Sequence, residues 1–158
     1  MGFDIVAEFE GVLHELDAAA LEYAVCGGFA VSIHGHVRAT KDIDLLIRRE
    51  ALDQILRSVR RPGFTIDGGP IPFGVGTRAE RELYRVSKSD GKTLLTLDLL
   101  LVTPVFEEVW RTRERARWGT RGVWVVSLAG LERMKRLAGR TQDLADLEAL
   151  GLLGDGSR

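Results

Sequence analysis

Two aspartates, Asp42 and Asp44, interrupt an apolar segment that continues to Ile47. Side chains two positions apart project from the same face of a β-strand, so the two carboxylates would lie side by side. Anions this close repel one another. A divalent cation would relieve the repulsion, and ligation by oxygen atoms alone suits Mg²⁺. The pair therefore predicts a metal site on one face of a strand.

A third acid, Asp98, lies within the strongly apolar run from Leu94 to Val102. Burying a carboxylate there is costly unless it is ligated, paired or at an exposed edge. If its strand lies beside the first, the three carboxylates can hold two divalent ions, which stabilise the attacking and leaving oxygens of a phosphoryl or nucleotidyl transfer. Asp42 and Asp44 would bind both ions; Asp98 would bind the ion nearer the acceptor and could act as base. The alternative is surface acids on strand edges with arginine partners.

The composition of the 158 residues is that of one folded domain, with a hydrophobic share of 45% and a net charge of −1. The balanced charge gives no electrostatic footprint for nucleic acid, although basic residues cluster at 57–61 and 111–121. Cys26 is the only cysteine, which excludes an intrachain disulfide and a cysteine-based zinc site. With no signal sequence and no apolar window of membrane-spanning length, we expect a cytoplasmic protein that has no membrane partner.

Hydrophobic periodicity and turn residues predict alternating helices and strands. Helices are expected at 4–21, 29–34, 50–60, 104–116, 128–138 and 142–150, and strands at 23–26, 42–47, 83–87, 93–102 and 123–126. Ser89-Asp90-Gly91 indicates a hairpin between two of these strands, because Asp-Gly favours a tight turn. The glycines and prolines of 67–76 predict a surface loop.

This order of elements indicates an α/β (α+β) fold in which helices cover a mixed β-sheet. We expect a single domain over 1–153, with a core at about 22–103 and a helical C-terminal part at about 104–153. Residues 154–158 are expected to form a flexible tail.

The segment from Tyr23 to Ile47 combines three spaced elements: Gly27-Gly28, His34-Gly35 and Arg38-x-Thr40-x-Asp42-Ile43-Asp44. This pattern resembles the signature of the polymerase-β-like nucleotidyltransferase superfamily, and the small bacterial members related to abortive-infection toxins are the most similar. The resemblance is strong over this segment, moderate at Asp98 and weak in the C-terminal helices. It implies a nucleotidyltransferase fold in which the three aspartates are catalytic and bind metal.

The resemblance also implies which residues hold the nucleotide. Gly27 and Gly28 would cradle the triphosphate with backbone N–H groups, and Arg38 and Thr40 would line the phosphate or acceptor side. Lys135 could reach the triphosphate from the C-terminal helices. Without the resemblance, two glycines are typical of a tight turn and Arg38 of a solvated side chain, so both interpretations stay open.

Position 28 departs from the family pattern, because many members have serine after the first glycine. A hydroxyl contact to the terminal phosphate is then missing, or it comes from Ser32 or Thr40. In the C-terminal helices, Arg140 and Asp143 could form an ion pair that locks the helices together, which is an alternative to a role at the site.

The three acids and the resemblance together predict a nucleotidyltransferase of EC 2.7.7 type that depends on Mg²⁺ or Mn²⁺. It would transfer a nucleoside monophosphate from a nucleoside triphosphate such as ATP to an acceptor hydroxyl and release pyrophosphate. The acceptor could be a protein, a tRNA or a small molecule such as an aminoglycoside. The toxin-like resemblance favours a macromolecule, within a toxin–antitoxin or phage-defence pair that has an antitoxin partner. The alternative is a catalytically weak regulatory module of the same fold that binds nucleotide or a partner protein.

Overall fold

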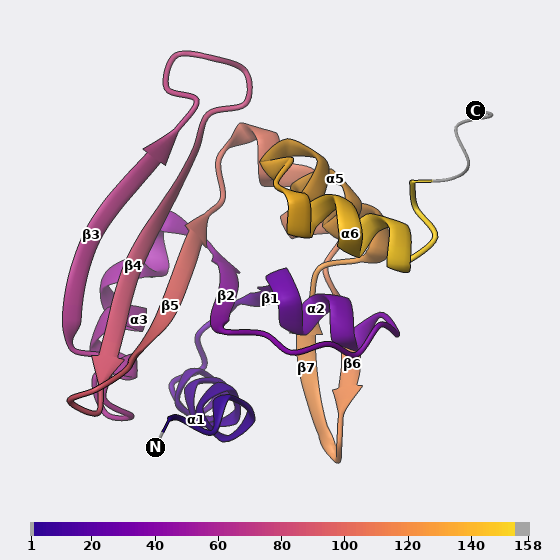
Figure 1. Ribbon diagram of the computed structural model, residues 1–158. Coiled ribbons are helices and arrows are strands. Elements are labelled where there is room, and N and C mark those ends of the chain that lie inside the picture. Colours follow the sequence, from indigo (N-terminus) through magenta and orange to yellow (C-terminus); the bar gives the residue numbers. More distant parts are fainter. Residues whose placement is uncertain (1, 154–158) are drawn as a thin grey trace.

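The computed structural model describes residues 2–153, which form a seven-stranded sheet and six α-helices (Figure 1). The strands are β1 (Ala24–Cys26), β2 (Asp42–Ile47), β3 (Ile66–Phe73), β4 (Arg81–Ser89), β5 (Leu94–Leu101), β6 (Glu114–Trp118) and β7 (Arg121–Val125). The helices are α1 (Ile5–Ala18), α2 (Gly27–Ile33), α3 (Leu52–Val59), α4 (Glu107–Arg111), α5 (Leu128–Ala138) and α6 (Thr141–Ala149), with 3₁₀ turns η1 (Arg49–Ala51) and η2 (Pro104–Phe106). The expected tail at 154–158 lies outside the described residues.

The sheet has the order β3-β4-β5-β2-β1-β7-β6. The pairs β2 with β5 and β1 with β7 are parallel, whereas the other neighbours are antiparallel. Strands β2 and β5 lie near the middle of the sheet and bury Ile43, Leu45, Leu97 and Leu99 completely. Burial on both faces explains why their sequences are nearly continuous apolar runs. The predicted mixed sheet is confirmed.

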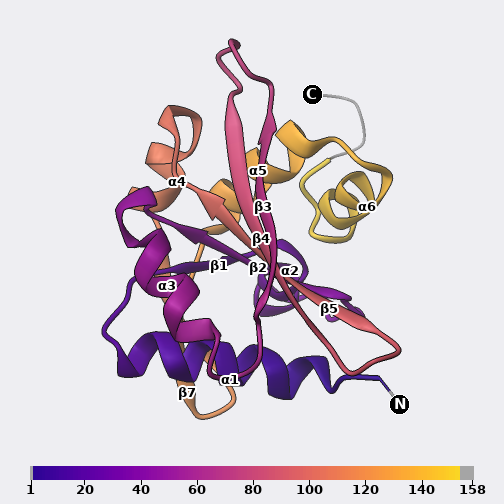
Figure 2. The same ribbon diagram turned by 90° about the vertical axis from the view of Figure 1, so that its left-hand side faces the viewer.

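Helices cover the sheet, and Figure 2 shows α3 and α6 on either side of β3, β4 and β5. Helix α1 is amphipathic and buries Phe9, Val12, Leu13 and Leu16 against the core. The ring of Phe9 stacks on Phe29 of α2 with centroids 3.9 Å apart. Among the described residues, no helix combines the length and the apolar character that crossing a membrane requires.

The loop predicted at 67–76 is wrong over most of its length, because 66–73 forms strand β3. Proline cannot donate to a strand ladder, but β3 is an edge strand that pairs with β4 alone, and edge positions tolerate proline. The register shifts between Asp67 and Gly69, which accommodates the glycines as a bulge. A composition typical of a loop therefore forms the outer strand of a hairpin that projects above the sheet (Figure 1).

The helix predicted at 104–116 is also too long. The helical part consists of η2 and α4 and ends at Arg111, where the Thr112 hydroxyl donates to the Glu108 carbonyl at 2.8 Å. Residues 114–118 instead form β6, which pairs with β7 across a turn at Gly119. Trp118 then packs edge-on against Phe9 and Phe29, so tertiary contacts decide the conformation of this segment. The end of the segment expected to be helical, 114–116, thus belongs to β6, and β7 includes most of the strand predicted at 123–126.

Candidate active site

The three predicted aspartates lie on one face of the sheet. In the parallel pair of β2 and β5, Asp44 is the direct partner of Asp98, and Asp42 precedes Asp44 by one side-chain period on the same strand. Asp98 is buried, Asp44 is half-buried and Asp42 is exposed. The two strands that carry the acids are therefore adjacent, which is the condition under which the three carboxylates can converge.

The surroundings of Asp44 disfavour its negative charge. Burial is the largest cause, followed by repulsion from Asp98 and then Asp42, and together they raise the pKa of Asp44 to about 7 although Lys135 and Arg140 act in the opposite sense. Burial and the charge of Asp98 also raise the pKa of Asp42. The carboxylates of β2 thus lack a counter-charge that would balance them.

Asp98 has such a counter-charge in Arg85 of β4. The Nε and one terminal nitrogen of Arg85 donate to the two oxygens of Asp98 at 2.8 and 3.0 Å. The two residues face each other across the antiparallel pair of β4 and β5. The alternative to a metal site is surface acids on strand edges with arginine partners. Asp98 does have an arginine partner, but it is buried in a central strand and does not lie at an edge.

The donor chemistry of the three carboxylates fits a divalent cation, because they supply hard oxygen ligands. Burial, followed by repulsion from Asp98 and Asp42, raises the pKa of Asp44, and a nearby cation would lower it. Neither Asp42 nor Asp44 forms an ion pair with any residue between 2 and 153. Over the same residues no three His, Cys, Asp or Glu side chains are arranged to hold one ion, and both oxygens of Asp98 are engaged by Arg85.

Gly27 lies in direct contact with Asp44. Its φ of +65° is in the left-handed region, and a Cβ atom built there would lie 2.7 Å from the carboxyl carbon of Asp44. Only glycine allows the chain to leave β1, start α2 and leave room for this carboxylate. The tight turn is therefore also the wall of the acidic site.

Gly28 is in equally close contact with the segment before β2. A Cβ atom at position 28 would lie 2.6 Å from the Thr40 hydroxyl oxygen and 2.9 Å from its Cβ. The Thr40 hydroxyl donates to the Asp42 carbonyl at 3.2 Å. Of the two hydroxyl groups that could replace the family serine, Thr40 lies where a side chain at position 28 would project.

This contact predicts that Gly28→Ser and Thr40 are coupled. We expect Gly28→Ser alone to lower the free energy of unfolding by about 1–3 kcal/mol, because two side chains then compete for one space. Adding Thr40→Gly should recover most of the loss. Denaturant unfolding of both single variants and of the double variant measures the coupling. Gly11→Ser, where nothing lies within 4 Å of the new atom, is the control; simple additivity of the two changes would contradict the prediction.

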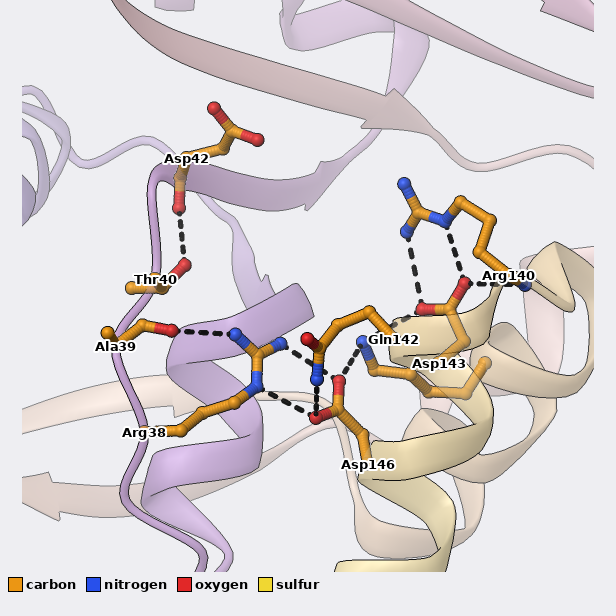
Figure 3. Close-up of polar contacts among 9 residues, drawn as sticks. Arg38, Ala39, Thr40, Asp42, Arg140, Gln142, Asp143 and Asp146 are labelled. Atoms are coloured by element: carbon orange, nitrogen blue, oxygen red, sulfur yellow. Dashed lines mark hydrogen bonds and ion pairs between the residues drawn. The ribbon is translucent and has the colours of Figure 1, made fainter.

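Arg38 forms an ion pair with α6 (Figure 3). Its Nε and a terminal nitrogen donate to the two oxygens of Asp146 at 2.7 and 2.9 Å, and another donates to the Ala39 carbonyl at 2.8 Å. Although burial opposes ionisation, the hydrogen bonds from Arg38 and Lys135 lower the pKa of Asp146 to about 2. The guanidinium implied as a phosphate ligand is thus already paired with a buried carboxylate.

Lys135 is buried between two acids of the same helix. Its ammonium lies 3.0 Å from Asp143 and 2.9 Å from Asp146, and Arg140 pairs with Asp143 at 2.7 Å. The anticipated pair of Arg140 and Asp143 is therefore confirmed, and Lys135 is the residue that joins α5 to α6. Two of the three ammonium hydrogens are used within the protein.

A cavity of about 330 Å³ opens over Asp44 and Asp98. Its floor includes Gly27, Asp44 and Asp98, and Lys135 contributes from α5, whereas Gly28, Arg38, Thr40 and Asp42 are not part of its lining. The hairpin of β3 and β4 and the helices α5 and α6 supply the remaining walls, which include Phe73, Arg81, Arg85, Leu131, Met134 and Arg140.

The sequence interpretation missed Arg85 and the other cavity residues of the hairpin. A signal for Arg85 exists in the hairpin register, because the β4–β5 connection fixes which residue faces Asp98. The ladder closes at Ser89 opposite Leu94, which brings Arg85 opposite Asp98. No comparable signal marks Phe73, since its segment has the composition of a loop.

A seven-stranded mixed sheet that presents aspartates from adjacent strands beside a glycine turn is the arrangement that the resemblance to nucleotidyltransferases predicts. The profile of the aminoglycoside-2″-adenylyltransferase family matches residues 8–94, and the chain belongs to that family. The superfamily resemblance is thus confirmed. Among curated proteins, none matches this sequence.

Solved structures share the fold. The crystal structure of ANT(2″)-Ia in complex with adenylyl-2″-tobramycin aligns with a TM-score of 0.63 at 14% identity, over 94% of this chain and 88% of that one. The solution structure of ANT(2″)-Ia gives 0.63 at 15% identity, over 96% and 84%. The protein TM1012 from Thermotoga maritima gives 0.63 at 12% identity, over 92% and 91%. At these identities the likeness concerns the fold.

Proposed function

We propose that the protein transfers a nucleoside monophosphate from a nucleoside triphosphate to a hydroxyl group of a small molecule and releases pyrophosphate, with Mg²⁺ or Mn²⁺ as cofactor. The observation that carries the proposal is the strand register, which places Asp44 of β2 opposite Asp98 of β5 at the floor of the cavity. Two carboxylates of different strands beside an open space are suited to a reaction in which negative charge moves between phosphate oxygens.

Asp42, Asp44 and Asp98 would hold the divalent ions. When bound, the ions neutralise the charge that develops on the attacking and leaving oxygens. The register of β2 and β5, which brings Asp44 opposite Asp98, supports this assignment. Burial and the neighbouring acids raise the pKa of Asp44, which a bound cation would lower. Gly27 keeps the backbone close to that carboxylate, and backbone N–H groups of the turn would cradle the triphosphate.

In the proposed reaction the acceptor hydroxyl oxygen forms a bond to the α-phosphorus while the bond between the α-phosphorus and the bridging oxygen breaks. The electron pair of that bond leaves with pyrophosphate. Asp98 accepts the hydroxyl proton, since it lies on the cavity floor next to Asp44. Lys135 and Arg140, which also line the cavity, bring positive charge to the phosphate side.

The cavity favours a small acceptor over a protein or a tRNA. Its volume of about 330 Å³ is in the range of small-ligand sites. The structural neighbour ANT(2″)-Ia was solved with adenylyl-2″-tobramycin, and the family carries the name of an aminoglycoside adenylyltransferase. We therefore propose an aminoglycoside-like sugar alcohol as the acceptor and ATP as the donor. A macromolecular acceptor or an antitoxin partner is the competing outcome.

Asp98→Asn tests the proposal. We expect the variant to bind ATP nearly as well as the wild type and to lose about 100-fold or more of the transfer rate, because the base that accepts the proton is gone. Isothermal titration with a non-hydrolysable ATP analogue measures binding, and pyrophosphate release in the presence of an aminoglycoside measures transfer. Asp53→Asn, an exposed acid on α3, is the matched control. Unchanged turnover of Asp98→Asn would reject the assignment.

The acceptor is identified in a parallel assay. The wild type is incubated with labelled ATP and Mg²⁺ together with an aminoglycoside panel, total tRNA or a protein lysate. We expect the label in the small-molecule fraction and mass spectrometry to show the addition of one AMP. Label in the tRNA or protein fraction alone would overturn the small-molecule acceptor and leave the nucleotidyl transfer standing.

A further inference from the structure

Arg85 and Asp98 form an ion pair at the floor of the cavity, and their side chains differ in exposure. The side chain of Asp98 is 9% exposed, whereas that of Arg85 is 44% exposed. Asp98 is held in the central part of the sheet, because its neighbours Leu97 and Leu99 are fully buried. The acid is therefore fixed and the arginine has room to move.

The guanidinium uses both oxygens of Asp98, at 2.8 and 3.0 Å. This bidentate geometry is the strongest pairing that a carboxylate makes with a side chain. A cation that took Asp98 as a ligand would have to displace at least one of these two hydrogen bonds. Asp44 and Asp42 present no such obstacle, because no ion pair holds them among residues 2–153.

A displaced Arg85 has a place to go. Its side chain lines the cavity on the same face of β4 as Arg81 and Leu83. The hydrogen bonds to Asp98 raise the pKa of Arg85, and the negative charges of Asp42 and Asp44 act in the same sense. In that position the planar fork of the guanidinium would face whatever anion occupies the cavity.

We propose that Arg85 is a positioning residue which holds the Asp98 carboxylate in the metal-free protein and competes with a divalent cation for it. When a cation binds, it then replaces Arg85 as the partner of Asp98, and the Arg85 side chain moves into the cavity. The inference rests on the proposed function, because it takes Asp98 as a ligand of the cation. It adds a residue that neither the family match nor the sequence pattern assigns.

The test measures the dissociation constant of Mn²⁺ without nucleotide, by electron paramagnetic resonance of the free ion. Arg85→Gln should bind Mn²⁺ about tenfold more tightly than the wild type, since a competing charge-assisted pair is removed. Arg140→Gln is the matched control, because Arg140 also lies near Asp42 and Asp44 but pairs with Asp143. It should tighten binding about twofold at most, because the charge that is lost is hydrogen-bonded to Asp143 and not to Asp98.

A double variant separates local competition from general electrostatics. In an Asp98→Asn background, Arg85→Gln should have no more effect than Arg140→Gln. Arg85→Lys, which keeps the charge but not the fork, should tighten binding less than Arg85→Gln and serves if the glutamine variant is unstable. Equal tightening by Arg85→Gln and Arg140→Gln, or tightening that persists without Asp98, overturns the inference even if the wild type transfers nucleotide. If neither the wild type nor any variant binds Mn²⁺, both this inference and the proposed metal-dependent function are rejected.

Discussion

Asp44→Asn should abolish nucleotidyl transfer and at the same time stabilise the metal-free protein at neutral and alkaline pH. The loss of transfer, about 1,000-fold or more, follows from the removal of the central ligand among the three acids. The gain in stability follows from the raised pKa of Asp44, about 7 against an ordinary value of 3.8. The asparagine side chain has nearly the same shape as that of aspartate but carries no charge, so its burial in this site costs less free energy.

The sign of the pH dependence is fixed by proton binding. Between about pH 4 and about pH 7 the folded protein keeps a proton on Asp44 that the unfolded chain releases. Stability therefore falls as the pH rises through this window, and the variant avoids that fall. Above pH 7 we expect the variant to be more stable by roughly 1–4 kcal/mol. Thermal unfolding from pH 4 to pH 8 without metal measures the difference.

Metal addition provides the control for Asp44→Asn. Mg²⁺ or Mn²⁺ should raise the melting temperature of the wild type at pH 8 and leave that of the variant nearly unchanged. A variant that is less stable than the wild type at pH 8 without metal would show that Asp44 is not under electrostatic stress. A variant that retains transfer would remove Asp44 from the catalytic residues.

Gly27→Ala should cost both stability and activity. The left-handed φ of +65° disfavours any residue with a Cβ by about 1–2 kcal/mol, and the new atom would collide with the Asp44 carboxylate. We expect the displaced carboxylate to lower the transfer rate roughly 100-fold, as misplacement of a reacting group does elsewhere. Steady-state kinetics and denaturant unfolding measure the two effects.

Gly119→Ala isolates the backbone contribution to this result. Its φ of +64° is nearly the same, but nothing lies within 4 Å of the atom that would be added, and it belongs to the turn between β6 and β7. We expect a similar loss of about 1–2 kcal/mol with normal transfer. If Gly27→Ala retained normal transfer as well, contact between the glycine turn and Asp44 would have no part in catalysis.

The acidic site could be predicted from the sequence because its aspartates lie within short apolar segments, where burying a carboxylate costs free energy. An Asp-x-Asp pair and a lone aspartate in apolar strands demand a compensating arrangement, and only adjacent strands supply it. Arg85 lacks such a signal, since an arginine in a half-exposed strand costs little. Its role appears only when the hairpin register brings it opposite Asp98.

The fold was less predictable where tertiary pairing overrides local preference. Pro70 and Pro72 argue against a strand, yet an edge position makes them acceptable. Residues 114–116 are expected to end a helix, but they belong to β6, which pairs with β7 and places Trp118 against the core. Arg38 and Asp146 are 108 positions apart, and no spacing rule relates residues at that distance.

The link between Arg38 and Asp146 has a consequence for the order of assembly during synthesis. The segment before β2 leaves the ribosome long before α6, and its guanidinium finds its buried partner only when α6 docks. Until then Arg38 has no acid from α6, and Lys135 is without both of its acids. The nascent chain therefore completes the surroundings of β2 late, so the proposed active site is finished only after α6 has been made.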